Sequence, residues 1–180
     1  TDKGSLSPVF SPTEMNYTVT VPYETTSLTI TGVTADSNAS MEPESGEVTV
    51  NNLVVGVAQT ATIKVRAEDG STEKTYTVTV TREAASSDAN LQSLTVSDNF
   101  SLDPEFDALT TSYTVTVPYA TESLTITGKT ADPKASMNPE NGLVTVSDLK
   151  VGEEQTVTIT VTAEDGTEKT YTITVTKLAN

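Results

Sequence analysis

The feature of this sequence that most constrains its fold is a hairpin-like stretch that occurs twice, once with an inserted residue. Residues 162–177 read TAEDGTEKTYTITVTK, and residues 66–82 read RAEDGSTEKTYTVTVTR. In both copies Val, Ile or Tyr alternates with Thr beside a polar turn, which is typical of two antiparallel strands joined by a tight loop. Because side chains alternate between the two faces of a strand, a slip of one residue would turn the whole apolar set outward.

The inserted residue must therefore be absorbed by the loop. In the second copy, a three-residue loop with Gly in the left-handed position places Ile159 opposite Tyr171. In the first copy, a four-residue loop over residues 68–71 places Ile63 opposite Tyr76. The core face keeps its phase in both hairpins, which is a structural requirement and not a catalytic one.

The hairpin belongs to a longer repeat with a period of 96 residues. A period this long exceeds that of stacked solenoid repeats, so each copy should be a complete domain. We expect one domain over residues 1–84 and a second over residues 89–180, with the small and polar residues 83–90 as a linker. The offset of 96 links Tyr17 with Tyr113, Pro22 with Pro118, and Gly56 with Gly152.

Each copy is rich in short runs in which Val, Ile, Thr and Tyr alternate, and no stretch shows the apolar spacing of a helix. Six or seven such runs in about 90 residues, with close turn signals, predict an all-β fold of two tandem immunoglobulin-like antiparallel β-sandwich domains with essentially no helix. In the second copy we expect strands at 91–97, 113–118, 123–130, 143–148, 155–164 and 170–177.

The first copy departs from the second at its start. Thr1 aligns with Ser97, so the first domain lacks a counterpart of the LQSLT strand. The strand next to it would then present unpaired backbone groups. We expect this edge to be frayed, covered by a non-homologous segment, or paired with another molecule. Since Thr1 is not Met, the chain is interpreted as part of a longer protein, whose neighbouring domains are its first expected partners.

Composition narrows the function. The chain carries 10 basic and 25 acidic residues, a net charge of −15, and no His, Cys or Trp. This balance argues against nucleic acid and anionic membranes as partners, and no run approaches the ~18 apolar residues of a membrane span. Without His there is no Ser–His triad. Asp36 and Asp132 head equivalent turns with one carboxylate each, which indicates turn chemistry and not a metal site. We expect no enzyme activity, no cofactor and no metal.

The ordered motifs LQSLTVS, YTVTVPY and TAEDGTEKTYTITVTK, the latter two found in both copies with small changes, resemble the bacterial cadherin-like β-sandwich module, an immunoglobulin-like domain. The resemblance covers nearly the whole chain in two tandem copies. It implies an extracellular location in cell-surface or secreted proteins of bacteria and no shared catalytic residues. It does not bring calcium with it, because the acidic inter-domain motifs of true cadherins are absent.

These observations predict a structural spacer or stalk. The alternative is an adhesion module that binds polysaccharide or a host surface protein, either on its own or as an accessory to an enzyme. Tyr23 and Tyr119, each in a VPY motif after a strand, are the candidate ligand residues because a Tyr face can stack on a sugar ring. Packing over the end of the sandwich is the simpler role for both. Arg82 and Lys177 end their strands and should extend their charged groups to solvent there.

Overall fold

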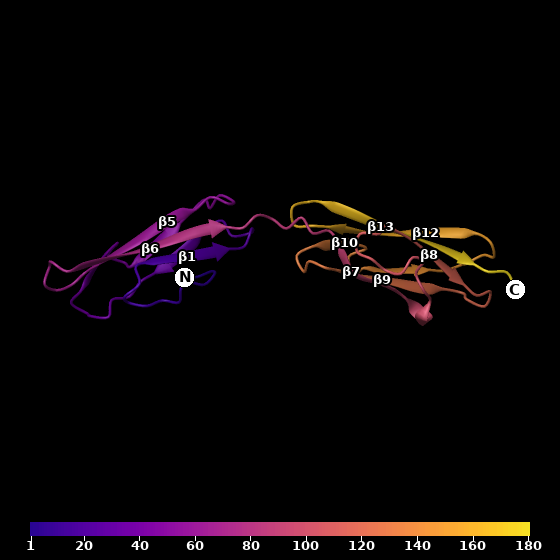
Figure 1. Ribbon diagram of the computed structural model, residues 1–180, viewed down its shortest axis with the longest axis horizontal. Coiled ribbons are helices and arrows are strands. Elements are labelled where there is room, and N and C mark those ends of the chain that lie inside the picture. Colours follow the sequence, from indigo (N-terminus) through magenta and orange to yellow (C-terminus); the bar gives the residue numbers. More distant parts are fainter. The chain divides into compact units, whose positions relative to one another are not determined.

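The computed structural model describes residues 1–180 and consists of two units, Thr1–Ala85 and Ser86–Asn180 (Figure 1). Both units are built from strands packed as two sheets around an apolar core. The predicted fold class, tandem β-sandwich domains with essentially no helix, is confirmed. No helix in the chain is long and apolar enough to cross a lipid bilayer.

The first unit has a four-stranded sheet in the order β1-β6-β5-β3 and a two-stranded sheet, β2-β4. The alternating sequences place every second side chain in the core, as in β1, where exposed and buried positions alternate. The strands are β1 (Asn16–Val21), β2 (Leu28–Thr31), β3 (Ser40–Glu42), β4 (Glu47–Val50), β5 (Gln59–Arg66) and β6 (Glu73–Arg82).

The second unit has an equivalent four-stranded sheet, β10-β12-β13-β8, but its other sheet has three strands, β11-β9-β7. The short β10 lies between the expected strands 123–130 and 143–148, where the sequence analysis placed no strand. The elements are β7 (Leu91–Val96), a 3-10 turn (Ser97–Asn99), β8 (Ser112–Val117), β9 (Leu124–Thr130), β10 (Ser136–Asn138), β11 (Leu143–Val146), β12 (Glu154–Thr162) and β13 (Glu168–Lys177).

The predicted hairpin registers are confirmed. Ile159 pairs with Tyr171 across β12 and β13, and Ile63 pairs with Tyr76 across β5 and β6. The extra residue of the first unit lies in the turn, where the Ala67 N–H donates to Thr72 O at 2.9 Å. The insertion thus lengthens the loop and leaves the core faces unchanged.

Each larger sheet also contains one parallel pair, which the hairpin argument did not predict. β8 runs parallel to the C-terminal strand β13, and β1 runs parallel to β6. The C-terminal strand of each unit is therefore bonded on both edges, antiparallel on one side and parallel on the other. Parallel neighbours require a long connection between them, and here the intervening strands supply it.

A tyrosine occupies the equivalent position in the core of each unit. Tyr17 and Tyr113 are buried in their respective units. The Tyr17 hydroxyl donates to Ser11 O at 2.7 Å, and the Tyr113 hydroxyl donates to Asp107 O at 2.6 Å. No buried side-chain nitrogen or oxygen lacks a hydrogen-bond partner. The polar groups that enter the cores are therefore satisfied, as stable packing requires.

The interpretation of residues 83–90 as a linker is wrong for its second half. Ala89 is buried in the core of the second unit. The Ser86 N–H donates to Glu164 Oε2 at 3.0 Å, and Ser86 O accepts from the Asp165 N–H at 3.0 Å. Small and polar residues look like linker in a sequence, but here they lead into β7 and are fixed by the β12–β13 loop.

Residues 1–8 form no strand equivalent to β7. Only Asp2 touches the edge of β2, where its N–H donates to Thr29 O at 3.1 Å and its carboxylate accepts from the Thr29 N–H at 2.8 Å. β2 has four residues, whereas its counterpart β9 has seven. The second half of the edge, beyond Thr31, has no strand beside it in the first unit.

Candidate functional site

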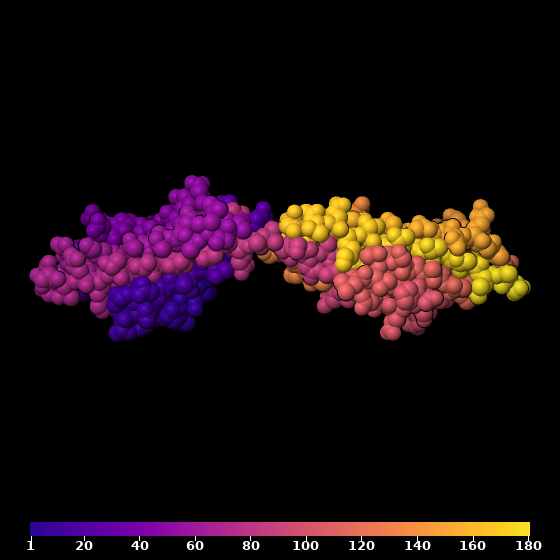
Figure 2. All heavy atoms as spheres, turned by 45° about the horizontal axis from the view of Figure 1, so that its top comes forward, coloured from indigo at the N-terminus to yellow at the C-terminus, as the bar shows by residue number.

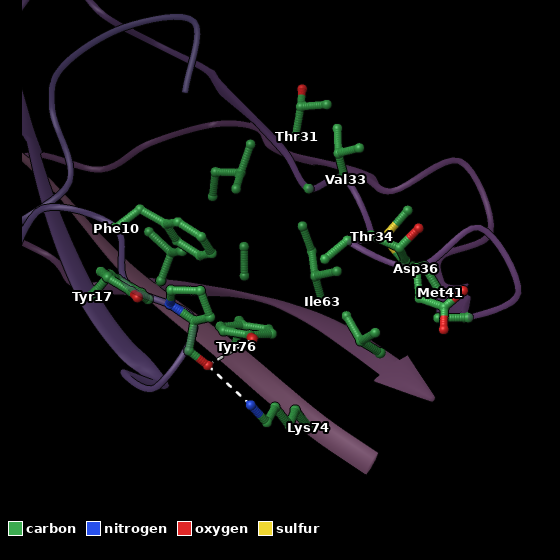
Figure 3. A pocket seen from close by; sticks show the side chains of 18 of the residues that line it. Phe10, Tyr17, Thr31, Val33, Thr34, Asp36, Met41, Ile63, Lys74 and Tyr76 are labelled. Carbon is green, nitrogen blue, oxygen red and sulfur yellow. Dashed lines mark hydrogen bonds between the residues drawn. The ribbon is translucent and has the colours of Figure 1, made fainter. Parts of the chain in front are cut away.

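The first unit is hollowed by an open groove of about 610 Å³ beside β2 (Figure 3). This volume lies within the range of about 300–1,000 Å³ typical of ligand sites. The lining is largely apolar, and it comes from both sheets and from the segments that precede β1 and follow β2. The lining residues that matter most below are Phe10, Gly32, Ile63, Val65, Lys74 and Tyr76.

The equivalent space in the second unit is filled by β7. Ala89, Leu91 and Leu94 are all buried there. A Cβ atom built on Gly128 would lie 3.2 Å from both Ile159 Cδ1 and Leu91 Cδ2, whereas a Cβ atom on its counterpart Gly32 would lie 3.2 Å from Ile63 Cδ1 and 3.8 Å from Gly46 O. The groove of the first unit is therefore the seat that Leu91 occupies in the second unit.

Without this strand, the first core is partly uncovered. Tyr171 and Val161 are 0% exposed in the second unit, but their counterparts Tyr76 and Val65 are half-buried. Phe10 is 57% exposed, and its ring lies 5.9 Å from the ring of Tyr17 and 6.0 Å from that of Tyr76. The aromatic side chains cluster at one end of the groove (Figure 3).

The polar groups of the groove rim also lack partners that the second unit supplies. The Tyr171 hydroxyl accepts from the Leu91 N–H at 3.0 Å and donates to Ala108 O at 2.8 Å. The Lys169 ammonium donates to the side-chain oxygen of Asn90. These contacts tie the start of β7 to β13.

In the first unit the matching groups keep only the contact to Pro12, the counterpart of Ala108. The Tyr76 hydroxyl donates to Pro12 O at 3.2 Å, and Lys74 Nζ donates to the same oxygen at 3.1 Å (Figure 3). No N–H donates to the Tyr76 hydroxyl oxygen. The groove thus offers a free acceptor and a cation along an apolar trough.

In the second unit, the surroundings shift the pKa values of two of these groups. Burial raises the pKa of the Tyr171 phenol above its ordinary value of 10. The hydroxyl of Ser86 and then the N–H of Lys134 lower the pKa of Asp132 by hydrogen bonding to its carboxylate. The counterpart of Asp132, Asp36, lines the groove and accepts from the Asn38 N–H at 2.9 Å. Both Asp residues form the turns that the sequence predicted.

The predicted ligand residues lie elsewhere. Tyr23 and Tyr119 stand where the C-terminal strands of their units end, and each belongs to a different unit. The Arg82 guanidinium carbon lies 4.8 Å from the centre of the Tyr23 ring, and Lys177 Nζ lies 5.5 Å from the centre of the Tyr119 ring. Tyr119 is 51% exposed and Tyr23 is half-buried. A ligand role for either residue stays a prediction.

The basic side chains also reach backbone carbonyls at these ends, Arg82 Nη1 to Leu53 O at 3.0 Å and Lys177 Nζ to Leu149 O at 3.4 Å. A cation over a Tyr ring uses the face that would otherwise stack on a sugar. No group of three or more Asp and Glu side chains is arranged to hold a metal ion.

The groove itself was not predicted, although its signal is in the sequence. The missing counterpart of LQSLT indicated an unpaired backbone edge, but it gave no indication that core side chains would line a hollow. Phe10, Tyr76 and Lys74 gain their place in the site only from the way the two sheets pack.

The sequence matches the model of the cadherin-like beta sandwich domain over residues 2–83 and again over residues 91–178. Among curated proteins, none matches the sequence. Solved structures found to be similar to this chain include the human desmocollin-1 ectodomain, at 14% identity and a TM-score of 0.39, covering 100% of this chain and 43% of that chain. They also include mouse cadherin-23 EC22-24, at 15% identity and a TM-score of 0.37, covering 98% of this chain and 67% of that chain.

Murine CEACAM1b is similar at 14% identity and a TM-score of 0.32, and the coverage is 75% of this chain and 66% of that one. The chain thus spans less than half of the desmocollin structure and about two thirds of the other two. Likenesses this weak carry no argument about function. The family match is different, because it covers both units over nearly their full length: the chain belongs to the cadherin-like beta sandwich domain family, in two tandem copies.

Proposed function

We propose that this chain is a non-catalytic structural spacer or stalk of a bacterial cell-surface or secreted protein. Domains of this family are typically extracellular structural or adhesion modules. The bacterial source and the surface location rest on the resemblance of the ordered motifs, and the neighbouring domains of a longer protein would be the partners that the spacer holds apart.

One observation carries the proposal: the chain enters and leaves the second unit at opposite ends of its longest strand. Ser86 is bonded to the loop that precedes β13. After β13, the Leu178 N–H donates to Val117 O at 2.9 Å. β13 has ten residues, which corresponds to roughly 33 Å at the rise of a strand. Figure 2 shows the yellow C-terminal residues extending along this unit. Each added domain of this kind therefore adds length between its neighbours.

The C-terminal strand is also well placed to carry tension. β13 has β12 on one edge and β8 on the other, with nine and six registered residue pairs. Sheet hydrogen bonds lie across the strand direction, so a pull along β13 loads many of them together instead of one after another. Such an arrangement suits a module that transmits force.

The second candidate is an adhesion module that binds polysaccharide or a host surface protein. The specific observation in its favour is the open groove of the first unit, together with Tyr119, which keeps half of its surface exposed. Ligand sites are concave and largely apolar with a few directed polar groups, and the groove fits that description better than the Tyr23 and Tyr119 ends do.

Binding of the whole chain to a glycan array and to cell-wall polysaccharides distinguishes the two functions. The spacer predicts no saturable binding by folded protein. Specific binding that is lost in the double variant Tyr23→Ala and Tyr119→Ala, but kept in Leu109→Ala, would replace the spacer with an adhesion module. Leu109 is a suitable control because it is 78% exposed.

A further inference from the structure

We propose that the second unit contains a site of intramolecular cross-linking, where the Lys169 amine condenses with the Asn90 carboxamide, releases ammonia and leaves an amide bond between the two side chains. The bond would join the segment that leads into β7 to the start of β13. The inference rests on how these side chains pack and does not depend on the spacer function.

The three groups that such a condensation needs, an amine, a carboxamide and a carboxylate, contact one another in a row. The Lys169 ammonium donates to Asn90 Oδ1. The Asn90 Nδ2–H donates to Asp88 Oδ1 at 2.6 Å. The amine therefore touches the carboxamide whose carbon it would attack, and the carboxylate touches the nitrogen that would leave. Groups held in this way react far faster than the same groups free in solution.

The backbone fixes the residues that carry these groups. Lys169 lies in β13 and pairs with Val161 of β12. Asn90 O accepts from the Ala131 N–H at 2.9 Å. The Asn90 N–H donates to Asp88 Oδ1, also at 2.9 Å, which orients the carboxylate. The contact between Lys169 and Asn90 therefore belongs to the folded sandwich and does not depend on a mobile loop.

The site lies at the border of the apolar core. Asp88, Asn90 and Lys169 are half-buried. Ala89 and Leu91, the two residues that flank Asn90, are buried in the core. Partial burial limits the access of water, which would otherwise compete with the amine for the carboxamide.

The reaction balances without a further reactant. In its neutral form, Lys169 Nζ attacks Asn90 Cγ and forms a tetrahedral adduct. Asp88 takes a proton from Nζ and passes it to Asn90 Nδ2, as a general base and then a general acid. The Cγ–Nδ2 bond breaks, ammonia leaves, and the Cγ–Nζ amide bond remains. One amide replaces another, so nothing is oxidised or reduced.

The titratable groups that face the amine are Asp88, Asp107 and Tyr171. Burial is the main cause that raises the pKa of the Tyr171 phenol, and the charges of Asp88 and Asp107 raise it further. Lys169 Nζ also donates to Ala108 O at 3.5 Å. Because an amine attacks only in its neutral form, the rate of cross-linking should rise with pH.

The cross-link would change how the second unit carries a pull. A bond from Asn90 to Lys169 passes the load from the entry of the unit directly into β13, so residues 91–168 stay folded and unloaded. Lys169→Arg removes the nucleophilic amine and keeps the positive charge. A force measurement that is meant to unfold the entire second unit therefore uses Lys169→Arg.

Intact-protein mass spectrometry of the whole chain tests the proposal. Incubation at about pH 9 should remove the mass of one ammonia, and incubation at about pH 7 should remove it more slowly. After trypsin digestion, residues 83–129 should appear joined to residues 151–177. The joined peptides distinguish the cross-link from cyclisation at Asn141-Gly142, which releases ammonia but joins no two peptides.

Matched variants assign the groups. Lys169→Arg should abolish the joined peptides. Asp88→Asn should slow their formation at least tenfold, because the proton carrier is lost, while the far-UV circular dichroism stays that of folded protein. Lys74→Arg is the control and should leave the rate unchanged, because Lys74, the counterpart of Lys169, donates to the backbone oxygen of Pro12.

Two results would overturn the proposal. The first is a folded chain that yields no joined peptides after incubation at about pH 9. The second is joined peptides that form equally well in Lys169→Arg, because another group would then be the nucleophile. Equal rates in the parent and in Asp88→Asn would overturn the role of Asp88. Joined peptides that Lys169→Arg removes and Lys74→Arg preserves support the cross-link.

Discussion

Substitution of Leu91 by Ala tests how much the seated strand contributes to a sandwich of this family. The Leu91 side chain is 0% exposed and packs against Gly128. The backbone on both sides is fixed, by the hydrogen bond from the Leu91 N–H to the Tyr171 hydroxyl and by the pairing of Leu94 with β9. The cavity that Leu91→Ala leaves should therefore collapse little. The loss of unfolding free energy should then fall in the upper part of the range for Leu-to-Ala substitutions, about 3–5 kcal/mol.

Urea unfolding followed by NMR measures this in the whole chain, with the Gly128 amide as reporter of the second unit and the Gly32 amide as reporter of the first. At a urea dependence of about 1–2 kcal/mol per M, the midpoint at Gly128 should drop by roughly 1.5–5 M, while that at Gly32 stays unchanged. Leu109→Ala is the control, because that side chain is largely exposed. A drop below about 0.5 M at Gly128, or an equal drop at Gly32, would refute the reasoning.

Three further outcomes follow. Tyr171→Phe should lower the unfolding free energy of its unit by about 1–3 kcal/mol because it leaves the Leu91 N–H unpaired, whereas Tyr76→Phe should cost under ~1 kcal/mol; equal costs by urea titration would contradict this. Deleting Ser71 should keep the hairpin register and change stability by less than about 1 kcal/mol, because the loop then matches that of the second unit; loss of the folded amide spectrum would show otherwise. Hydrogen bonds from Thr72 lower the pKa of Asp69 from 3.8 to about 2, so its contribution to stability is present above pH ~4 and disappears as pH falls toward 2. The melting temperature of Asp69→Asn should therefore depend less on pH across this interval than that of the parent, and identical profiles would exclude the effect.

The hairpins were predictable because their constraint is local. Two strands joined by a short loop share a face only if the loop length suits the alternation, and the two copies with their different loops obey that rule. This is why the pairs Ile159–Tyr171 and Ile63–Tyr76 could be named from the sequence alone.

The parallel pairs β1–β6 and β8–β13 could not be predicted in the same way. Their partners lie about 60 residues apart in sequence, and no alternation rule states which free edge a distant strand will join. The same limit applies to the groove. An unpaired edge follows from a missing strand, but its lining by Phe10 and Tyr76 depends on the packing of one sheet over the other.

The paired tyrosines show a further limit. A VPY motif places Tyr23 and Tyr119 after a strand, but the cation that lies over each ring comes from the far end of the unit's sequence. Periodicity predicted that Arg82 and Lys177 end their strands. It did not predict that they would lie over these rings.

Single-molecule force spectroscopy of the whole chain with Lys169→Arg, held at its two ends, tests the spacer account most directly. The account predicts two separate unfolding events, one per unit. The event of the second unit, Ser86–Asn180, should release about 300 Å of chain, given an extended length of roughly 3.4 Å per residue and a folded length near that of β13. The first unit, whose edge is open, should unfold at the lower force. Gradual extension without resolved events, or a single event for the whole chain, would contradict it.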